Sequence, residues 1–257
     1  MRVKVLGAHN TESRDTRYVS LLVDDVLAVD AGCLTSSLTF EEQVRIQSIL
    51  LTHGHYDHIR DIPALGINLY LRSRTVDVYT HPAVYSNITG FFLNGEVYSA
   101  FHKERTESKA SLNFHLIEAG RQFQAGGYEV LAVPVRHAIA TLGYQVTSPD
   151  GGSFFYTGDT GQGLSEAWAA ISSPVLFIEV TASSKWAQSG IRHGHLTPVQ
   201  LKSELEAFKQ IRGYFPRVIT VHMNPSDESN IRSELAEVAS DIGVSIELAY
   251  EGMLIQI

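Results

Sequence analysis

Short apolar runs, rich in β-branched and aromatic residues, recur along the whole chain and predict strands separated by turns and helices. The predicted strands lie at 2–6, 18–23, 26–29, 48–52, 76–79, 113–117, 128–135, 142–146, 154–157, 175–180, 217–221 and 249–255. Three helices are predicted between them, beginning at Thr39, at Thr197-Pro198 and near Ser226. Each has a start signal or an apolar stripe at helical spacing, and the third ends before Gly243. Because strands and helices alternate, the predicted class is α/β.

The same pattern argues for one domain. The chain has 257 residues, 44% of them hydrophobic, which is enough to bury a sizeable core. No Pro/Ser-rich linker or low-complexity tract divides it, so we expect a single domain over 1–257. The least regular segment is about 80–111, where Asn, Gly and Ser interrupt several aromatic residues. This segment is interpreted either as a cap over a site or as a plain surface helix and loop.

Charge and cysteine content narrow the expected partners. The net charge is −8 with no Lys/Arg cluster, which is a poor surface for a polyanion, so a nucleic-acid partner is not expected. The single cysteine, Cys33, cannot form an internal disulfide and is expected to be a buried apolar residue. The chain has no apolar run of about 18 residues and turns polar by His9, which excludes a membrane span and a signal peptide. We therefore expect a cytoplasmic protein.

The strongest chemical signal follows the predicted strand at 48–52. There the sequence runs His53-Gly54-His55-Tyr56-Asp57-His58. In a turn that leaves a strand, residues two apart can converge on one ion. Residues four and five positions after the first histidine can reach a second, neighbouring ion site if a helix begins there. The motif thus predicts two adjacent cation sites, and the alternative is a solvated polar loop.

Three further strands end in the same residue types. His137 follows the predicted strand at 128–135, Asp159 follows 154–157, and His222 follows 217–221. Ligand sites in α/β sheets gather at the carboxyl ends of strands, so these side chains are candidates for the same metal centre.

The order H-x-H-x-D-H, His, Gly-Asp-Thr, His resembles the metallo-β-lactamase superfamily of binuclear metallohydrolases. The resemblance covers nearly the whole chain and implies a four-layer αβ/βα sandwich. It implies two divalent metal ions, with zinc expected and manganese or iron as alternatives. It assigns His53, His55 and His137 to one metal, Asp57, His58 and His222 to the other, and Asp159 to a bridging position. Asp30 matches an aspartate of the family that would orient a ligand imidazole by a hydrogen bond, or it serves only a turn.

The ligand types also separate branches of this family. A β-lactamase would be expected to have Cys where Asp159 stands, and a flavodiiron protein would have Glu where His55 stands. Gly194-His195-Leu196-Thr197-Pro198, together with Glu179, is similar to the phosphodiesterase branch, which includes tRNA 3′-end endonucleases and class II cyclic-nucleotide phosphodiesterases. Opening a phosphodiester leaves an alkoxide that needs a proton, and a histidine held by a glutamate can donate it. His195 and Glu179 are therefore the candidate acid pair, and Asp57 would also orient the attacking water.

Within that branch, the resemblance favours hydrolysis of 3′,5′-cyclic nucleotides to nucleoside monophosphates. Asp159 follows His137 by only 22 positions, which leaves no room for the basic arm that tRNA enzymes insert there. The aromatic stretch at 91–101 also looks like one that class II phosphodiesterases carry. The candidate contacts to a small nucleotide substrate are Thr197, Asn224, Phe92 and Tyr98, the last two as stacking partners for the base. A homodimer is implied by resemblance alone. The alternatives are a tRNA 3′-processing nuclease, an arylsulfatase- or phosphonate-type esterase, and a ligand-binding scaffold without turnover.

Overall fold

A computed structural model describes residues 1–104 and 109–257, and within these the strands form two sheets that pack face to face. The first sheet has seven strands in the order β14 (Leu254–Gln256), β1 (Arg2–Gly7), β2 (Ser20–Val23), β3 (Leu27–Val29), β4 (Ser48–Leu51), β5 (Val76–Thr80) and β6 (Leu112–Leu116). Strands β3 to β6 run parallel, and the remaining pairs are antiparallel.

The second sheet repeats this plan in the later part of the chain. Its order is β13 (Ile246–Leu248), β12 (Arg217–Val221), β11 (Val175–Glu179), β10 (Ser153–Tyr156), β9 (Leu142–Thr147), β8 (Tyr128–Pro134) and β7 (Gln122–Ala125). Strands β10 to β13 are parallel. Because β8 and β10 are both antiparallel to β9, they also run in one direction. The carboxyl ends of β8, β10, β11 and β12 therefore lie at one edge of the sheet.

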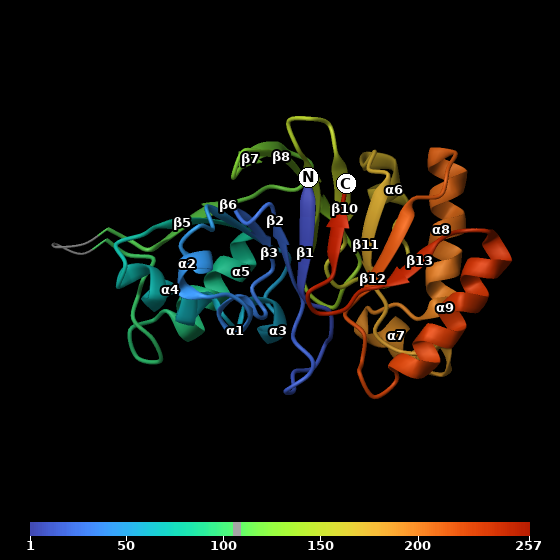
Figure 1. The fold of residues 1–257 in the computed structure, drawn as a ribbon, viewed down its shortest axis with the longest axis horizontal. Coiled ribbons are helices and arrows are strands. Elements are labelled where there is room, and N and C mark those ends of the chain that lie inside the picture. Colours follow the sequence, from blue (N-terminus) through green and yellow to red (C-terminus); the bar gives the residue numbers. More distant parts are fainter. Residues whose placement is uncertain (105–108) are drawn as a thin grey trace.

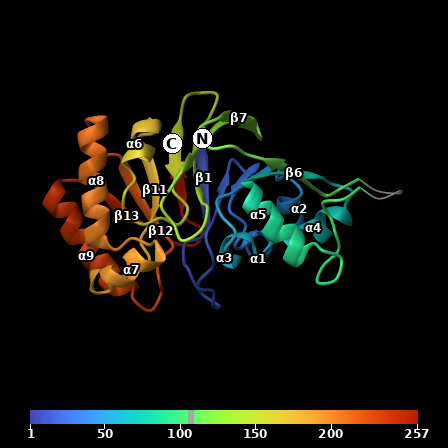
Figure 2. The same cartoon turned by 180° about the vertical axis from the view of Figure 1, so that it is seen from behind.

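Helices cover the outer face of each sheet. On the first sheet lie α1 (Leu34–Ser37), α2 (Phe40–Gln43), α3 (Tyr56–Ile59), α4 (Ile62–Tyr70), α5 (Pro82–Asn87) and the π-helix η1 (Ile88–Phe92). The later part of the chain contributes α6 (Ser165–Ala170), the 3₁₀-helix η2 (Ser184–Trp186), α7 (Ala187–His193), α8 (Pro198–Arg212) and α9 (Glu228–Ile242). Figure 1 shows α3 and α7 at the lower edge, opposite the two termini, and Figure 2 shows the same arrangement from behind. Among residues 1–104 and 109–257, none of the helices combines the length and the apolar character that a membrane span needs.

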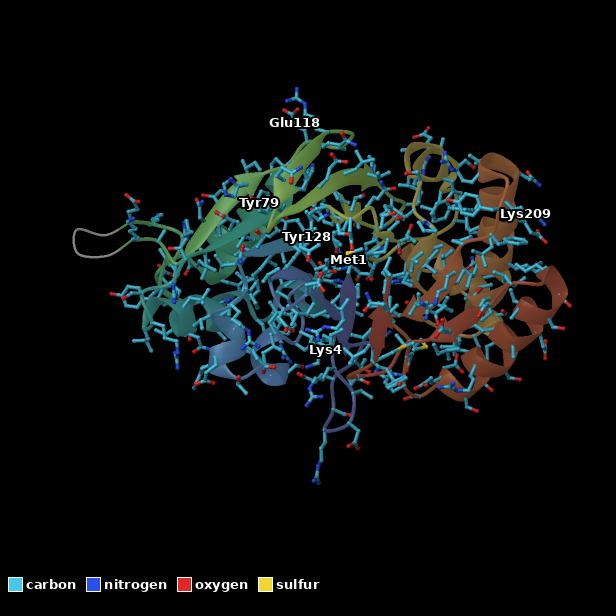
Figure 3. The ribbon with its side chains drawn as sticks, turned by 45° about the horizontal axis from the view of Figure 1, so that its top comes forward. Met1, Lys4, Tyr79, Glu118, Tyr128 and Lys209 are labelled. Atoms are coloured by element: carbon cyan, nitrogen blue, oxygen red, sulfur yellow. The ribbon has the colours of Figure 1, made fainter. Side chains whose placement is uncertain are left out.

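Three apolar clusters hold these four layers together. The central one fills the space between the sheets with side chains such as Leu21, Val29, Tyr144 and Phe177. Met1 and Tyr128 belong to it, whereas Glu118 and Lys209 lie at the exposed periphery (Figure 3). The other two clusters lie between each sheet and its helices. The predicted α/β sandwich of four layers is confirmed.

Some predicted elements were wrong in detail. The predicted strand at 249–255 is mostly a turn, in which Gly252 has φ +88°, and only its last two residues belong to a strand, β14. Strand β13, which lies just before this range, was missed. Apolar residues on both sides of the turn hide it from a periodicity argument. Strand β7, with the sequence Gln-Phe-Gln-Ala, was missed because its stability comes from pairing with β8 and not from its own composition. The helices α4, α5, α6 and α7 were also missed.

Candidate metal centre

The ligand candidates lie at the carboxyl ends of strands from both sheets. His53 follows β4, and the rest of that motif continues into α3. From the second sheet, His137 follows β8, Asp159 follows β10 and His222 follows β12. The helix α3 begins at Tyr56, which turns the later part of the motif away from the strand, as the sequence argument required for two neighbouring sites.

The first group of converging side chains is His53, His55, His137 and Asp159, whose ligand atoms all lie within 4.8 Å of one another. Nδ1 of His55 is 3.0 Å from Nε2 of His53 and 3.1 Å from Nε2 of His137. Oδ2 of Asp159 lies 3.6 Å from Nε2 of His53. Three imidazoles and a carboxylate at these distances form a donor set of the kind that zinc takes.

The second group is Asp57, His58, Asp159 and His222. Nε2 of His222 is 3.2 Å from Oδ2 of Asp57 and 3.4 Å from Oδ2 of Asp159. Asp159 belongs to both groups, which is the bridging position that the resemblance implied. The structure brings all seven candidate ligands together in the two sets that were expected.

Two buried atoms in this cluster lack hydrogen-bond partners. Nε2 of His58 and Oδ1 of Asp159 face each other at 3.2 Å, and neither has a partner among the described residues. A buried polar atom without a partner costs about 1–3 kcal/mol. A divalent cation between these atoms would remove that cost, so the residues fit a metal centre.

The charge states of the imidazoles agree with this fit. Burial lowers the pKa of His53 well below its usual value, and the neighbouring His58 adds to the effect. Burial also lowers the pKa of His55 and of His137. These three side chains are thus held neutral, which is the form of imidazole that binds metal.

His58 and Asp159, by contrast, are held in their charged forms. Burial acts to lower the pKa of His58, but the carboxylates of Asp159 and Asp30 overcome it and raise the pKa well above the usual range. Burial acts to raise the pKa of Asp159, but His222 and His58 hold it well below its usual value. The site therefore retains a negative charge at Asp159 and attracts a positive charge beside it, which a metal ion would supply in place of a proton.

Neighbouring groups fix the tautomers of four ligand imidazoles. Nδ1 of His58 donates to Oδ2 of Asp30 at 2.7 Å, and Nδ1 of His137 donates to the carbonyl oxygen of Gly194 at 2.8 Å. In the same way, Nδ1 of His53 lies 3.0 Å from the hydroxyl of Thr52, and Nδ1 of His222 lies 2.9 Å from that of Thr181. In each ring a proton sits on Nδ1, so Nε2 is the nitrogen that faces the cluster and is available to a metal ion.

Two threonines connect these imidazoles to buried carboxylates. The Thr52 hydroxyl donates its only hydrogen to Asp30, so its oxygen accepts from His53. The Thr181 hydroxyl donates to Oε2 of Glu179 at 2.8 Å, so its oxygen accepts from His222. Sequence reasoning missed Thr181, whose place two residues after Glu179 was the only available signal.

The backbone is strained where it presents two of these side chains. Asp30 has φ +58° and His222 has φ +63°, left-handed conformations that are uncommon for residues other than glycine. Each residue directly follows a strand region, and the left-handed turn redirects the chain at the site. Gly158, with φ +62°, could not carry a side chain because its Cβ would lie 2.9 Å from that of Thr52.

Beside the metal centre lies the predicted acid pair. Nδ1 of His195 is 2.7 Å from Oε1 of Glu179, which is fully buried at the end of β11. The same carboxylate accepts the backbone N–H of Thr160 at 3.1 Å. Burial acts to lower the pKa of His195, but the Glu179 carboxylate raises it to about 9. His195 is therefore held as a proton donor next to the ligand cluster.

A cavity of about 550 Å³ opens on the metal centre and on His195. Of the four expected substrate contacts, Thr197 and Asn224 line this cavity and the other two do not. Phe92 instead packs 6.3 Å from the ring of Tyr56, and Tyr98 packs 5.8 Å from that of Phe101. Sequence reasoning missed Trp186, which does line the cavity.

Part of the segment proposed as a cap lies against the metal motif. The side chain of Asn87, at the end of α5, comes within 2.8 Å of the point where a Cβ on Gly54 would lie. Residues 105–108 of this segment fall outside the described part of the chain. A cap over 80–111 thus stays a prediction.

Comparison with known proteins gives a family and a fold. Residues 23–223 match the sequence model of a family described as the β-lactamase superfamily domain. Ribonuclease Z of Limosilactobacillus reuteri (strain DSM 20016) is 30% identical over 109 residues, which cover 41% of this chain. The match spans only 32% of that relative's length.

Solved structures resemble the whole chain. Unliganded yeast PDE1 superposes with a TM-score of 0.85 at 16% identity, covering 100% of this chain and 99% of that one. The metallo-β-lactamase fold protein YhfI from Bacillus subtilis gives 0.74 at 18% identity, covering 99% and 98%. The short form of human tRNase Z gives 0.71 at 19% identity, covering 100% and 99%. At these identities the likeness establishes the fold.

Proposed function

The chain belongs to the metallo-β-lactamase superfamily, and from this premise we propose that it is a dinuclear metal-dependent phosphodiesterase that hydrolyses 3′,5′-cyclic nucleotides to nucleoside monophosphates. The observation that carries the proposal is the contact of 2.7 Å between His195 and the buried Glu179 carboxylate, at the rim of the ligand cluster. A proton donor in this position suits a reaction whose leaving group is an alkoxide.

The metal centre would be held by His53, His55 and His137 at one position, by Asp57, His58 and His222 at the other, and by Asp159 between them. Two divalent ions bound there would supply a water of lowered pKa and would neutralise charge on the phosphate oxygens. Zinc fits this set of imidazoles and carboxylates best, and manganese or iron are alternatives.

The protein's own residues perform the remaining tasks. His195 donates a proton to the leaving oxygen, and Glu179 keeps its imidazole oriented and charged. Asp57, partly exposed beside His222, orients the attacking water. Thr197 caps the 15-residue helix α8 and lines the cavity, so the positive end of that helix would stabilise a phosphate bound there.

A small substrate is favoured over RNA by two features. The residues between His137 and Asp159 form only β9, β10 and short connections, so no basic arm projects there. The net charge of −8 also opposes long contacts to a polyanion. The second candidate is a tRNA 3′-processing endonuclease, which is favoured by the 30% identity with ribonuclease Z over 109 residues.

The test measures metal content and turnover on one sample of protein purified without added metal. The substrates are cyclic AMP, cyclic GMP, a linear dinucleotide, bis-p-nitrophenyl phosphate and a precursor tRNA. We expect about two ions per chain and turnover of a cyclic nucleotide. His195→Gln should lower kcat by about 100-fold or more. It should keep the metal, since His195 belongs to neither of the two groups that hold the seven proposed ligands and joins only a third group, with Asp159, Glu179 and His222. Asp159→Asn should lose both metal and activity.

His115→Gln is the matched control, because this histidine also pairs with a carboxylate, that of Asp77, but lies on β6. Its kcat should equal that of the wild type. If His195→Gln stays within about threefold of the wild-type kcat, the acid assignment is wrong. Cleavage of precursor tRNA without turnover of either cyclic nucleotide would favour the second candidate.

A further inference from the structure

The cavity beside the metal centre is lined by two chemically different sets of residues. His55, His195 and Thr181 belong to the metal centre or contact its residues. The rest of the wall includes the apolar residues Ala138, Ala182, Trp186, Gly190 and Leu196, together with the polar residues His193, Thr197, Asn224 and Asp227. Among the described residues that line it there is no Lys or Arg. The wall around Trp186 thus offers apolar surface to a flat group and no cation to a second phosphate.

Trp186 is the largest side chain of that wall. Its residue is 54% exposed, whereas the other tryptophan, Trp168, is completely buried in the core. The indole of Trp186 therefore contributes little to the packing of the fold. A large aromatic face that borders a cavity next to a reaction centre is available to a ligand.

The turn that carries this indole is fastened on both sides. The backbone N–H and the hydroxyl of Ser183 donate to Oδ2 of Asp227 at 2.9 and 2.6 Å. The N–H of Ser184 donates to Glu234 at 2.7 Å, and Nζ of Lys185 donates to Oδ1 of Asp227 at 3.1 Å. Three consecutive residues before Trp186 are thus bound to carboxylates at the start of α9 and within it. The backbone segment that leads into Trp186 is therefore anchored to α9.

We propose that Trp186 is a specificity-determining residue that stacks on the nucleobase of the substrate. This assignment rests on the proposed function, because it places the phosphate at the metal centre and the base against the indole of Trp186 in the same cavity. It replaces the expected stacking by Phe92 and Tyr98, which lie outside the cavity and pack on other rings. Stacking on an indole accepts any base, so Trp186 selects for a nucleotide without selecting its base.

The kinetic test compares Trp186→Ala with Trp186→Phe on cyclic AMP and on ribose 3′,5′-cyclic phosphate, which has no base. Loss of a stacked base costs a factor of about 5 to 150 in binding. We therefore expect KM for cyclic AMP to rise by that factor in Trp186→Ala, with kcat within about threefold. Trp186→Phe should stay close to the wild type. The substrate without a base should show the same KM in all three proteins.

Equal rises of KM for both substrates would overturn the proposal, because they would indicate a disturbed cavity and not a lost stack. An unchanged KM for cyclic AMP in Trp186→Ala would overturn it as well. In either case the wild-type turnover of cyclic AMP would still support the phosphodiesterase assignment, so the two proposals fail separately.

A binding measurement tests the stack even if no cyclic nucleotide is hydrolysed. The chain has only two tryptophans, and only Trp186 is exposed, so adenosine 5′-monophosphate added to the metal-loaded protein should quench part of the fluorescence. Trp186→Phe should lose the quenching but keep the affinity measured by calorimetry, whereas Trp186→Ala should lose both. Quenching that persists in Trp186→Phe would show that the nucleotide binds elsewhere and would refute the assignment.

Discussion

Replacing Asp30 by Asn is expected to weaken one of the two metal positions selectively. The Asp30 carboxylate is fully buried and accepts hydrogen bonds from the N–H and hydroxyl of Thr52, from Nδ1 of His58 at 2.7 Å and from the hydroxyl of Tyr156 at 3.1 Å. Asn has the same shape and tolerates the φ of +58° at this position. The substitution therefore changes the hydrogen-bond chemistry with little change in packing.

The amide cannot serve all of these donors. If the amide oxygen still accepts the hydrogen bonds from Thr52, the NH₂ group faces Nδ1 of His58, and two hydrogen-bond donors then oppose each other. The conflict is relieved when the His58 proton moves to Nε2, which is the atom that points to Asp159. Metal binding must then displace that proton and leave a buried donor without a partner, at a cost of about 1–3 kcal/mol. This agrees with losses of about 10–100-fold for changes in groups that orient metal ligands.

The assay is competition with a chromophoric chelator at fixed pH, combined with the number of ions per chain after equilibrium dialysis. His58 belongs only to the second group of ligands, so one ion should bind about 10–100-fold more weakly and the other normally. Tyr156→Phe is the control, since it removes one hydrogen bond to Asp30 and leaves the His58 contact. Its metal affinities should stay within about threefold, with a stability loss of about 0.5–1.5 kcal/mol. Equal losses of metal affinity in Asp30→Asn and Tyr156→Phe, or an unchanged metal affinity in Asp30→Asn, would refute the proposed shift of the His58 proton.

Two further predictions concern groups outside the site. Cys33 is completely buried, and burial raises the pKa of its thiol to about 12. Less than about a tenth of this thiol should therefore react with Ellman's reagent in the native protein at pH 8, whereas all of it should react in guanidinium. His9 lies 2.7 Å from Glu251 and 3.3 Å from Glu228; burial acts to lower its pKa, but these carboxylates raise it above the unfolded value of about 6.5. The stabilisation from His9 is thus fully present below about pH 6.5 and is lost as pH rises through the raised pKa. The free energy of unfolding in urea should fall more between pH 6 and pH 8 in the wild type than in His9→Gln, and equal falls would contradict this reasoning.

The parts of the fold that the sequence predicts are those that local pattern determines. Strands β4, β8, β10, β11 and β12 are apolar runs bounded by polar residues, and their predicted positions agree with the structure within a few residues. The start of α8 at Pro198 and the end of α9 at Gly243 follow from local capping chemistry. The turn before β14 does not, because Glu251 is fixed there by contacts with Arg17 and His9, more than 230 positions away.

The candidate site also contains residues that the sequence reveals and residues that only the folded structure reveals. The seven ligand candidates could be identified from residue types at strand ends, because metal chemistry restricts those types strongly. The groups that orient them could not, because a threonine or a carbonyl oxygen carries no such restriction. Thr181 meets His222 only after β11 and β12 pair, and the Gly194 carbonyl meets His137 only after α7 folds against the β8–β9 connection. Trp186 was missed for the same reason, since its position beside the cavity depends on the turn before it, which hydrogen bonds to Asp227 hold in place.

The distribution of the ligands also explains why the fold keeps a buried carboxylate between its sheets. Each group takes two ligands from the motif after β4 and two from strand ends of the second sheet. Neither half of the chain can therefore form a metal position alone. Asp159 is nearly fully buried in this junction, where the neighbouring imidazoles of His222 and His58 hold its pKa well below the usual value. An ion that binds only the folded chain adds stability by mass action, and an ion bound here would do so by joining the two sheets. The buried polar cluster between the sheets destabilises the fold by itself, and the proposed metal binding would offset that cost.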